Sequence, residues 1–585
     1  MQGADTAIEW DEQTFELVLE QLRSDGTISA TNVRISAEEL ARILEAARED
    51  PADPGRRLFN GNVDFRHAIF ERPVAQFSRV TFEGFAAFDD ATFEGGAHFR
   101  NATFNGPETI EGFGGFQGAR FKGDAWFEHA TFNCGAPFDG ATFEGDANFM
   151  FSTFTGHARF GGAAFERGAA FYNATFEDQT FDGGTSKSLA EFSGATFGGG
   201  AGFSEACFKG SARFSHATFD SERNFDVRAD EALELNQAVF DEPIRLEASA
   251  AMLDCSRTQF RGGADLFVRG AAIVLDDADF AGPSMLAPRP GPVRAEESDE
   301  EPAPRLLSMR RTKVANLSIT GVDLRACRFE GAHGLDRLRL EGVRFAEAPW
   351  GWQRNKRWRV PTRWTRRLAI AEEHQWRAER AGAMGWYGPE MRASPALESA
   401  PPTPEQIAAT YRALRKGRED SKDEPGAADF YYGEMEMRRQ GPRARVTERP
   451  ADSDGSAEHE GRAPFESGLV GVASSRPAPR AERLILRLYW LVSGYGLRAS
   501  RALIALALTV VVFAFLFDLW GFRPDRGYGR ALLFSVESTS SLFRAPETEG
   551  AALSAGGELL QIMLRLLGPL FFGLALLSLR GRVKR

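Results

Sequence analysis

Apolar positions recur every five or six residues over much of the N-terminal half of the chain, and Phe fills most of them. Successive intervals alternate between six and five residues, so two units together span 11 residues. The Phe residues that set this rhythm, and that we predict to form the core, include Phe93, Phe104, Phe121, Phe132, Phe143, Phe154, Phe165, Phe176, Phe197, Phe208 and Phe219. The residues around them repeat as well, since Ala-Thr-Phe-Glu-Gly occurs at 91–95 and again at 141–145.

An α-helix does not account for this pattern, because a Gly falls in nearly every unit and Gly destabilises helix interiors. A chain that turns a corner every five or six residues accounts for it better. Gly permits the corner, the small Ala two positions before many of the Phe fits inside, and the Phe fills the axis. Stacked coils would lie roughly 4.8 Å apart, the spacing of neighbouring strands, so equivalent residues would form ladders.

These units resemble the pentapeptide-repeat family, whose unit is a small residue, a polar residue, a central Leu or Phe, and two more polar residues. The resemblance implies a mainly β fold, a right-handed quadrilateral β-solenoid, over residues 58–349. A sixth residue in alternate units predicts about 22 residues per coil where the family has about 20. The rhythm weakens after Phe225, and the Pro-rich, acidic residues 281–304 predict a solvated loop. A second block, from Leu324 to Phe345, predicts the last one or two coils.

The segments beside the solenoid carry helical patterns. Residues 1–57 predict a helical N-terminal cap, because Ser36 and Glu39 form a capping box ahead of an apolar stripe. Residues 350–440 hold a Trp- and Arg-rich segment and then a helical hairpin, with helices expected at 404–419 and 427–439. The Trp and Arg could stack on nucleic acid, but their place in the chain favours a cap or a membrane-surface contact. Residues 441–480 predict a disordered linker.

The last hundred residues change character and predict a membrane domain over 481–585. Two apolar runs, about 502–520 and 559–579, are long enough to span a bilayer, whereas a buried hairpin of a soluble domain is the alternative. Arginines precede the first run, and four basic residues follow the second. The positive-inside rule therefore predicts a multi-pass protein of the cell membrane with two spans, and with the solenoid and both termini in the cytoplasm. No signal peptide is expected.

Between the two runs, residues 531–543 predict a re-entrant-like segment. The layout resembles the two-transmembrane pore module of potassium channels, and Glu537, Ser540, Ser541 and Arg544 are its pore-like residues. A potassium filter needs backbone carbonyls from a Gly-containing segment directly after the pore helix, and none follows here. Gly-Tyr-Gly triplets occur instead at 494–496 and 527–529, ahead of the first span and of the re-entrant segment. Potassium selectivity is therefore not expected.

Two further segments, at 430–435 and 489–496, look like parts of the membrane-attached branch of the pentapeptide-repeat family. Both are rich in Tyr, and the second also holds Trp490. We associate no catalytic role with that branch, so the resemblance implies no enzyme activity.

Composition and charge add few candidates for chemistry. The chain has 49 Phe against 8 Tyr, and a net charge of -12. Residues 59–280 carry 33 acidic and 17 basic side chains, whereas residues 305–367 carry 5 acidic and 16 basic ones. The four cysteines lie far apart and the eight His are scattered, so we predict no catalytic, cofactor-binding or metal-binding residues.

The leading functional hypothesis is a membrane-anchored, non-enzymatic scaffold whose partners are the lipid bilayer and another protein. The first alternative is a channel-like or ligand-sensing oligomer that associates through the membrane domain. The second alternative is an acidic rod that mimics DNA toward a topoisomerase, although nucleic acid itself is not an expected partner. The sequence names neither the partner nor the ligand.

Overall fold

The structure is a computed structural model that describes residues 8–106, 115–133, 135–177, 179–181, 184–186, 189–221, 224–289, 303–349, 351–354, 361–364, 366–381, 386, 402–440, 480–523, 527–540 and 552–583. The chain divides into two compact units. The first comprises Met1–Arg366 and Ile370–Ala400, and the second comprises Arg367–Ala369 and Pro401–Arg585. Ile110, which takes one Phe position of the repeat, lies outside the described residues, as do Cys134, most of the 281–304 loop, and all of the predicted linker except Arg480.

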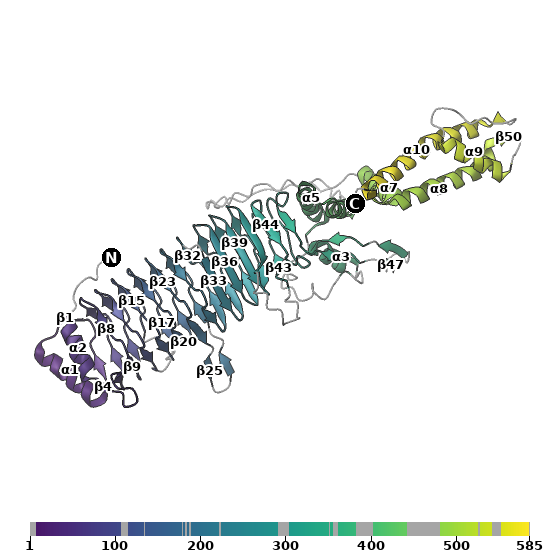
Figure 1. Cartoon of the computed structure of the whole chain (residues 1–585). Helices are drawn as coiled ribbons and strands as arrows, with labels where there is room; N and C mark the ends of the chain where they lie inside the picture. The colour runs from purple at the N-terminus through teal and green to yellow at the C-terminus, as the bar shows by residue number, and fades with distance from the viewer. Residues whose placement is uncertain are drawn as a thin grey trace, which may run out of the picture. The chain divides into compact units, whose positions relative to one another are not determined.

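The first unit is a β-solenoid of stacked coils (Figure 1). Each coil has four sides, and strands of consecutive coils pair along each side. Side 1 consists of β1 (Ile8–Glu9), β3 (Val33–Ile35), β7 (Ile69–Phe70), β11 (Thr92–Phe93), β14 (Arg120–Phe121), β18 (Thr142–Phe143), β22 (Ala164–Phe165), β28 (Thr196–Phe197), β32 (Thr218–Phe219), β35 (Val239–Phe240), β38 (Gln259–Phe260) and β41 (Asp279–Phe280). Side 2 consists of β8 (Ala75–Gln76), β12 (Ala97–His98), β15 (Ala125–Trp126), β19 (Ala147–Asn148), β23 (Ala169–Ala170) and β29 (Ala201–Gly202).

The other two sides run further toward the C-terminal end. Side 3 consists of β4 (Arg48–Glu49), β5 (Arg57–Phe59), β9 (Val80–Phe82), β13 (Thr103–Phe104), β16 (Thr131–Phe132), β20 (Thr153–Thr155), β24 (Thr175–Glu177), β30 (Cys207–Phe208), β33 (Asn224–Ala229), β36 (Ile244–Ser249), β39 (Ala264–Arg269), β42 (Ser284–Pro288), β44 (Leu317–Thr320) and β45 (Arg339–Glu341). Side 4 carries two ladders. The first consists of β2 (Ile28–Ser29), β6 (Val63–Asp64) and β10 (Ala86–Ala87), and the second consists of β17 (Ala136–Pro137), β21 (Ala158–Arg159), β27 (Leu189–Glu191), β31 (Ser211–Arg213), β34 (Ala232–Glu234), β37 (Met252–Asp254), β40 (Ala272–Val274) and β43 (Arg305–Ser308). The predicted mainly β, four-sided solenoid is therefore confirmed.

Stacked Phe rings fill the axis of the solenoid. All eleven Phe named from the sequence are buried, each at most 5% exposed. The rings of Phe121 and Phe143 are 4.8 Å apart and inclined by 2°, and those of Phe143 and Phe165 repeat this geometry at 4.8 Å and 3°. Within the interior, Phe143 also meets Phe149 edge to face at 6.0 Å and 81°. Each ring thus stacks along the axis and contacts other rings edge-on, which are the two favoured aromatic geometries.

The number of residues per coil changes partway along the solenoid. Phe121 pairs with Phe143, 22 residues later, whereas Phe240 pairs with Phe260, 20 residues later. The change begins at β33, a six-residue strand that lies beside both β29 and β30 and so replaces separate strands on sides 2 and 3. Its sequence alternates polar and apolar residues, the pattern of a longer strand. The solenoid therefore continues without interruption where the Phe rhythm weakens.

Two of the corners depend on residues in the left-handed region. At the corner from side 4 to side 1, Gly140 and Gly162 have φ near +65°, and His216 takes the same place with φ of 61°. At the corner from side 2 to side 3, the left-handed residue is Asn101, Asn173 or another side chain. Gly serves best here because it lacks the Cβ that makes this region costly. Elsewhere Gly allows the backbones of consecutive coils to approach closely. A Cβ atom on Gly145 would lie only 2.5 Å from the carbonyl carbon of Gly123 in the preceding coil.

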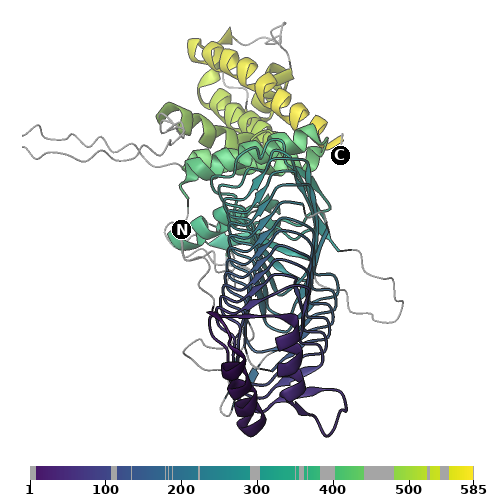
Figure 2. The ribbon, with the colours of Figure 1, turned by 90° about the vertical axis from the view of Figure 1, so that its left-hand side faces the viewer.

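The N-terminal end of the solenoid is covered by two helices (Figure 2). α1 (Glu12–Asp25) begins at the capping residue Asp11, and α2 (Ala37–Ala46) begins at Ser36, with the predicted capping box of Ser36 and Glu39. α2 follows the side 1 strand β3 and packs on β8, so it takes the place of a side 2 strand in the first coil. Residues 1–57 thus supply strands β1 to β4 as well as the predicted helices.

The remaining elements of the first unit lie outside the regular coils. β25 (Gln179–Phe181) and β26 (Gly184–Ser186) form an antiparallel hairpin that projects from the side of the solenoid (Figure 1). β47 (Gly351–Arg354) and β48 (Pro361–Trp364) form a second hairpin, and α3 (Ala371–Ala381) follows. The Trp- and Arg-rich segment therefore contains both a hairpin and a helix.

The second unit is helical. The predicted hairpin is present as α5 (Pro404–Asp420) and α6 (Glu424–Gln440). α7 (Arg480–Ser493), which the sequence did not predict, precedes α8 (Ala499–Leu516), and the π-helical turn η2 (Phe517–Gly521) extends α8. α9 (Tyr528–Ser540) and α10 (Ala555–Val583) both pack against α8, and β50 (Phe522–Arg523) pairs with β51 (Ala552–Leu553). Ala499–Gly521 and Ala555–Leu577 are long and apolar enough to cross a membrane.

We expect Phe143→Ala to lower the free energy of unfolding of its part of the solenoid by about 3–5 kcal/mol, because it removes one ring from a closely packed stack. Thr142→Ala is the matched control, since this neighbouring side chain points outward and its loss should cost under about 1 kcal/mol. Urea unfolding followed by limited proteolysis measures both. Equal stability of the two variants would contradict the assigned core.

Candidate functional site

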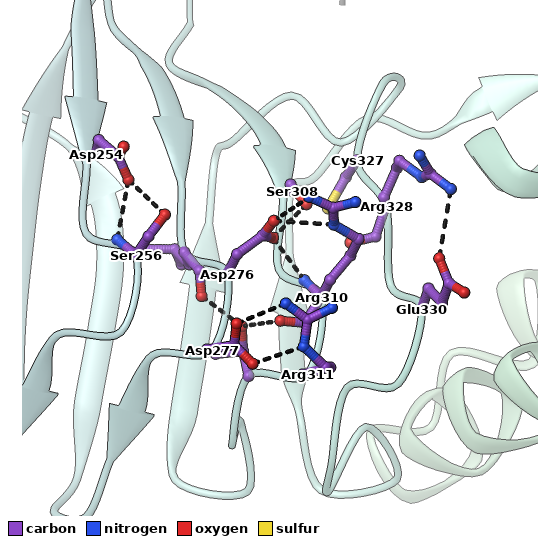
Figure 3. A network of polar contacts seen from close by, with 12 residues as sticks. Asp254, Ser256, Asp276, Asp277, Ser308, Arg310, Arg311, Cys327, Arg328 and Glu330 are labelled. Atoms are coloured by element: carbon purple, nitrogen blue, oxygen red, sulfur yellow. Dashed lines mark hydrogen bonds and ion pairs between the residues drawn. The ribbon is translucent and has the colours of Figure 1, made fainter. Parts of the chain in front are cut away.

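Polar side chains gather at the corner from side 4 to side 1 in the last coils of the solenoid (Figure 3). Buried Asp276 accepts hydrogen bonds from the Ser308 hydroxyl, from the Arg310 backbone N–H at 2.9 Å and from Arg310 Nε at 2.9 Å. In the same corner, Arg311 donates two hydrogen bonds to Asp277, which lower the pKa of that carboxyl. Charge-assisted bonds therefore link consecutive coils at the point where the Phe stack ends.

A carboxylate from α3 closes the edge of the last coil. Glu372 is 1% exposed, and its Oε1 accepts a hydrogen bond from the backbone N–H of Phe329. In the preceding coil, the equivalent N–H donates to a carbonyl of the next coil, as Met309 N does to Arg328 O at 2.9 Å. Glu372 thus replaces a strand partner at an otherwise open edge. This role supports the cap interpretation of the Trp- and Arg-rich segment.

Burial shifts the titration of the groups around this edge. Desolvation raises the pKa of Glu372 to about 7. Burial, reinforced by Glu372 and Asp276, also raises the pKa of the Cys327 thiol. A protonated, buried thiol is a poor nucleophile and metal ligand. The corner is therefore suited to holding coils together, and no set of metal-ligating side chains is present in the part of the chain that the structure describes.

α3 also holds a buried ion pair. Arg377 Nε donates to Glu373 Oε1 at 2.7 Å, and the guanidinium lies 4.9 Å from the ring centroid of Trp386. His374 contributes a hydrogen bond between its Nδ1 and the Trp386 carbonyl oxygen at 2.8 Å. Together these contacts fix a Trp of the Trp- and Arg-rich segment against α3.

In the second unit, the two Tyr-rich segments singled out from the sequence come together. We call the group of Tyr432, Glu436, Arg439, Trp490 and Tyr495 the aromatic cluster. Tyr495 donates its hydroxyl hydrogen to Glu436 Oε2 at 3.1 Å, and Trp490 Nε1 donates to the Tyr432 hydroxyl at 3.1 Å. Arg439 donates to Glu436 and stacks over Trp490. Burial and the Glu436 carboxylate raise the pKa of Tyr495. The cluster fastens the α5–α6 hairpin to α7.

The Gly-Tyr-Gly triplet at 494–496 is a corner and not a filter. Gly494, Tyr495 and Gly496 have φ values of 55°, 60° and 76°, so three consecutive residues are left-handed. The Gly494 N–H donates to the Trp490 carbonyl, and the Gly496 N–H donates to Ser493 Oγ, both at 3.0 Å. These bonds end α7 and turn the chain into α8. A left-handed Tyr is costly, and its buried hydroxyl bond to Glu436 stabilises the turn.

The pore-like residues do not gather into a site among those the structure describes. Glu537 lies on the exposed face of α9, and Ser540 is the last residue of that helix. Ser541 and Arg544 lie outside the described residues. α9 instead packs Phe534 against Phe517 and Leu564.

Two serines on the buried face of α9 were not expected from the sequence. Ser535 and Ser538 are fully buried, and their Oγ atoms have no hydrogen-bond partner among the described residues. The sequence signal for this pair was their spacing of three residues, which places both serines on the same face of the helix among apolar neighbours.

An aromatic side chain on the outside of the solenoid was also not expected from the sequence. Phe151 occupies the left-handed position at the corner from side 2 to side 3, with φ of 56°, and is 40% exposed. Its ring stacks on His129 at 4.9 Å and meets Tyr172 edge-on at 6.0 Å. A left-handed, exposed Phe costs energy without filling the core, which marks the surface around it as a candidate for binding.

Comparison with known proteins agrees with the geometry of the solenoid. A protein-family model described as pentapeptide repeats (9 copies) matches residues 65–109, 88–142, 116–164 and 138–185. The match identifies pentapeptide repeats in residues 65–185. No curated protein matches the chain.

We expect the attachment of α3 to weaken as the pH rises from about 4.5 to about 7. The pKa of Glu372 is raised from 4.5 to about 7, so the stabilisation is complete below pH 4.5 and is lost as the pH rises through about 7. The full effect should be roughly 3 kcal/mol. Hydrogen exchange at the Phe329 amide measures it, with Glu372→Gln as the control that should abolish the pH dependence. The same dependence in both proteins would contradict this assignment.

We expect Phe151→Asn to leave the stability of the solenoid within about 1 kcal/mol of the parent, because Asn tolerates the left-handed conformation that costs Phe roughly 1–2 kcal/mol. Asn already occupies this corner at Asn101 and Asn173. Phe149→Asn, which places the same side chain in the core, is the destabilised control. Thermal unfolding compares the three proteins, and a large loss in Phe151→Asn would assign the ring a structural role.

Proposed function

We propose that the chain is a membrane-anchored, non-enzymatic scaffold that presents a pentapeptide-repeat solenoid to another protein. The apolar surface of the two long helices carries this proposal. Only 22% of the apolar window of Ala499–Gly521 and 17% of that of Ala555–Leu577 is buried. Leu508 and Phe515 of α8 and Leu566 and Leu570 of α10 are each more than half exposed. Side chains of this kind are stable when lipid surrounds them.

The arrangement of the helices supports one topology. α8 and α10 pack side by side, and α10 also contacts α7, which precedes α8. Arg498 and Arg501 begin the first span, and basic residues follow the second. Both ends of the pair would then lie on the cytoplasmic side, together with the solenoid.

The solenoid surface supports a protein partner over nucleic acid. Residues 59–280, which form most of it, carry 33 acidic side chains against 17 basic ones, and this balance disfavours contact with a phosphate backbone. The exposed ring of Phe151, with His129 and Tyr172 beside it, offers the apolar and aromatic contacts that protein interfaces favour.

A channel-like or ligand-sensing oligomer is the second candidate. It is favoured by the buried hydroxyls of Ser535 and Ser538 on α9, which packs against both long helices. Exposed apolar helix faces could also pair between copies. Steady ion current from the purified full-length protein in planar bilayers would favour this candidate over the anchor.

We expect the full-length protein to stay in the membrane pellet after an alkaline carbonate wash and to be released only by detergent. Leu508→Arg with Val512→Arg should shift it toward the soluble fraction, since each charge at the centre of a span costs about 2.5–3.5 kcal/mol. Two arginines at the outward-facing Thr142 and Thr153 are the matched control and should change nothing.

The same preparation tests the topology. Single cysteines at Asp420 and Tyr528, in a background without the native cysteines, should react with an impermeant label from opposite sides of the membrane. Labelling of both from one side would refute the two-span arrangement.

A further inference from the structure

α7 presents an apolar face that is left exposed within its own unit. Leu484, Ile485, Leu488 and Leu491 are each more than half exposed. Ile485, Leu488 and Leu491 follow Leu484 by one, four and seven residues, and this spacing places all four on one side of the helix. Exposed Leu residues scattered singly need no explanation, but a continuous stripe along a helix does.

The opposite side of α7 is held against the hairpin. Leu486 is buried with Met435 and Tyr495, and Tyr489 and Trp490 pack against the same group. Arg438 of α6 also pairs with Glu482 near the start of α7. These contacts fix the rotation of α7 about its axis, so the exposed stripe cannot turn inward to be covered by α6.

We propose that this stripe lies in the lipid surface, so that α7 is an interfacial helix and a third membrane-contacting element. This inference rests on the proposed membrane anchor. The left-handed corner at 494–496 joins α7 directly to α8, so the stripe is continuous in sequence with a membrane-spanning segment. A helix with one apolar and one polar face next to a span suits the boundary between headgroups and acyl chains.

The side chains that border the stripe match the chemistry of a bilayer surface. Arg487 is exposed and lies next to Leu491 around the helix, with Arg483 beyond it. Long Arg side chains can extend from an embedded helix to headgroup phosphates, and anionic lipids attract them.

A second copy of the chain fits this face less well. In a two-fold contact the same patch meets itself, so both copies would bring Arg483 and Arg487 to one interface, with no negative charge supplied by the stripe. Lipid headgroups offer negative charge at that place. The lipid surface is therefore the favoured occupant, and through the aromatic cluster it would hold the α5–α6 hairpin next to the bilayer.

Nitroxide accessibility in lipid vesicles tests this placement. The full-length protein, with Cys134, Cys207, Cys255 and Cys327 replaced by Ala, carries one label at a time at Leu484→Cys, Leu488→Cys, Leu508→Cys or Asp420→Cys. The vesicles contain anionic and zwitterionic lipid. Leu508 in α8 reports the proposed span, and the exposed Asp420 of α5 is the matched water-facing control. The measured quantity is the collision rate with oxygen relative to that with a water-soluble nickel complex.

We expect this ratio at Leu484 and Leu488 to be at least about fivefold higher than at Asp420 and to lie between the values at Asp420 and Leu508, as suits an interfacial helix. A water-like ratio at Leu488 with a lipid-like ratio at Leu508 would overturn the interfacial helix and leave the anchor intact. A water-like ratio at Leu508 would overturn both. Low collision rates with both reagents at Leu488 would mean that protein covers the stripe, which would also overturn the proposal.

Discussion

Stacking of Phe rings between consecutive coils is the interaction on which the rest of the solenoid depends. Two-residue strands supply few hydrogen bonds per side, so the backbone ladder alone specifies register weakly. A ring that must lie about 4.8 Å above an identical ring specifies it strongly. Segments inserted between repeats therefore lie outside the ring stack. The β25–β26 hairpin interrupts the sequence between Phe160 and Phe192, yet those two rings are 4.8 Å apart and inclined by 1°.

The ends of the stack show what happens where a ring has no neighbour. At the N-terminal end, α2 takes the place of a strand and covers the first coils. Toward the C-terminal end, Leu275 and Met309 line the interior, ion pairs link the corners, and Glu372 accepts the edge N–H of Phe329. That carboxyl is buried at a cost, which its raised pKa reflects. The solenoid thus ends in polar contacts that are weaker and more dependent on pH than its centre.

The sequence predicted most of the fold because a repeated core requires the same residues at the same interval along the chain. It predicted the Phe core, the N-terminal helices, the α5–α6 hairpin and the two apolar helices. It missed the shift to 20-residue coils at β33, because alternation over six residues replaces the Phe signal there. It also missed α7 and the contact between Tyr495 and Glu436, since 59 residues separate the partners and only tertiary packing joins them. Phe151 carries no local sign of its left-handed backbone.

Disulfide mapping of the register tests this account most directly. Cysteines at Thr142 and Ala164, which pair across coils 22 residues apart, should cross-link rapidly, because neighbouring strands bring their Cα atoms within the roughly 4.4–6.8 Å that a disulfide needs. Cysteines at Gln259 and Asp279, 20 residues apart, should cross-link equally well. Exchanging the intervals, with Thr142 against Gly162 or Gln259 against Ala281, should leave the thiols free. Cross-linking at one interval throughout the solenoid would contradict the change in coil length and the ring stack that sets it.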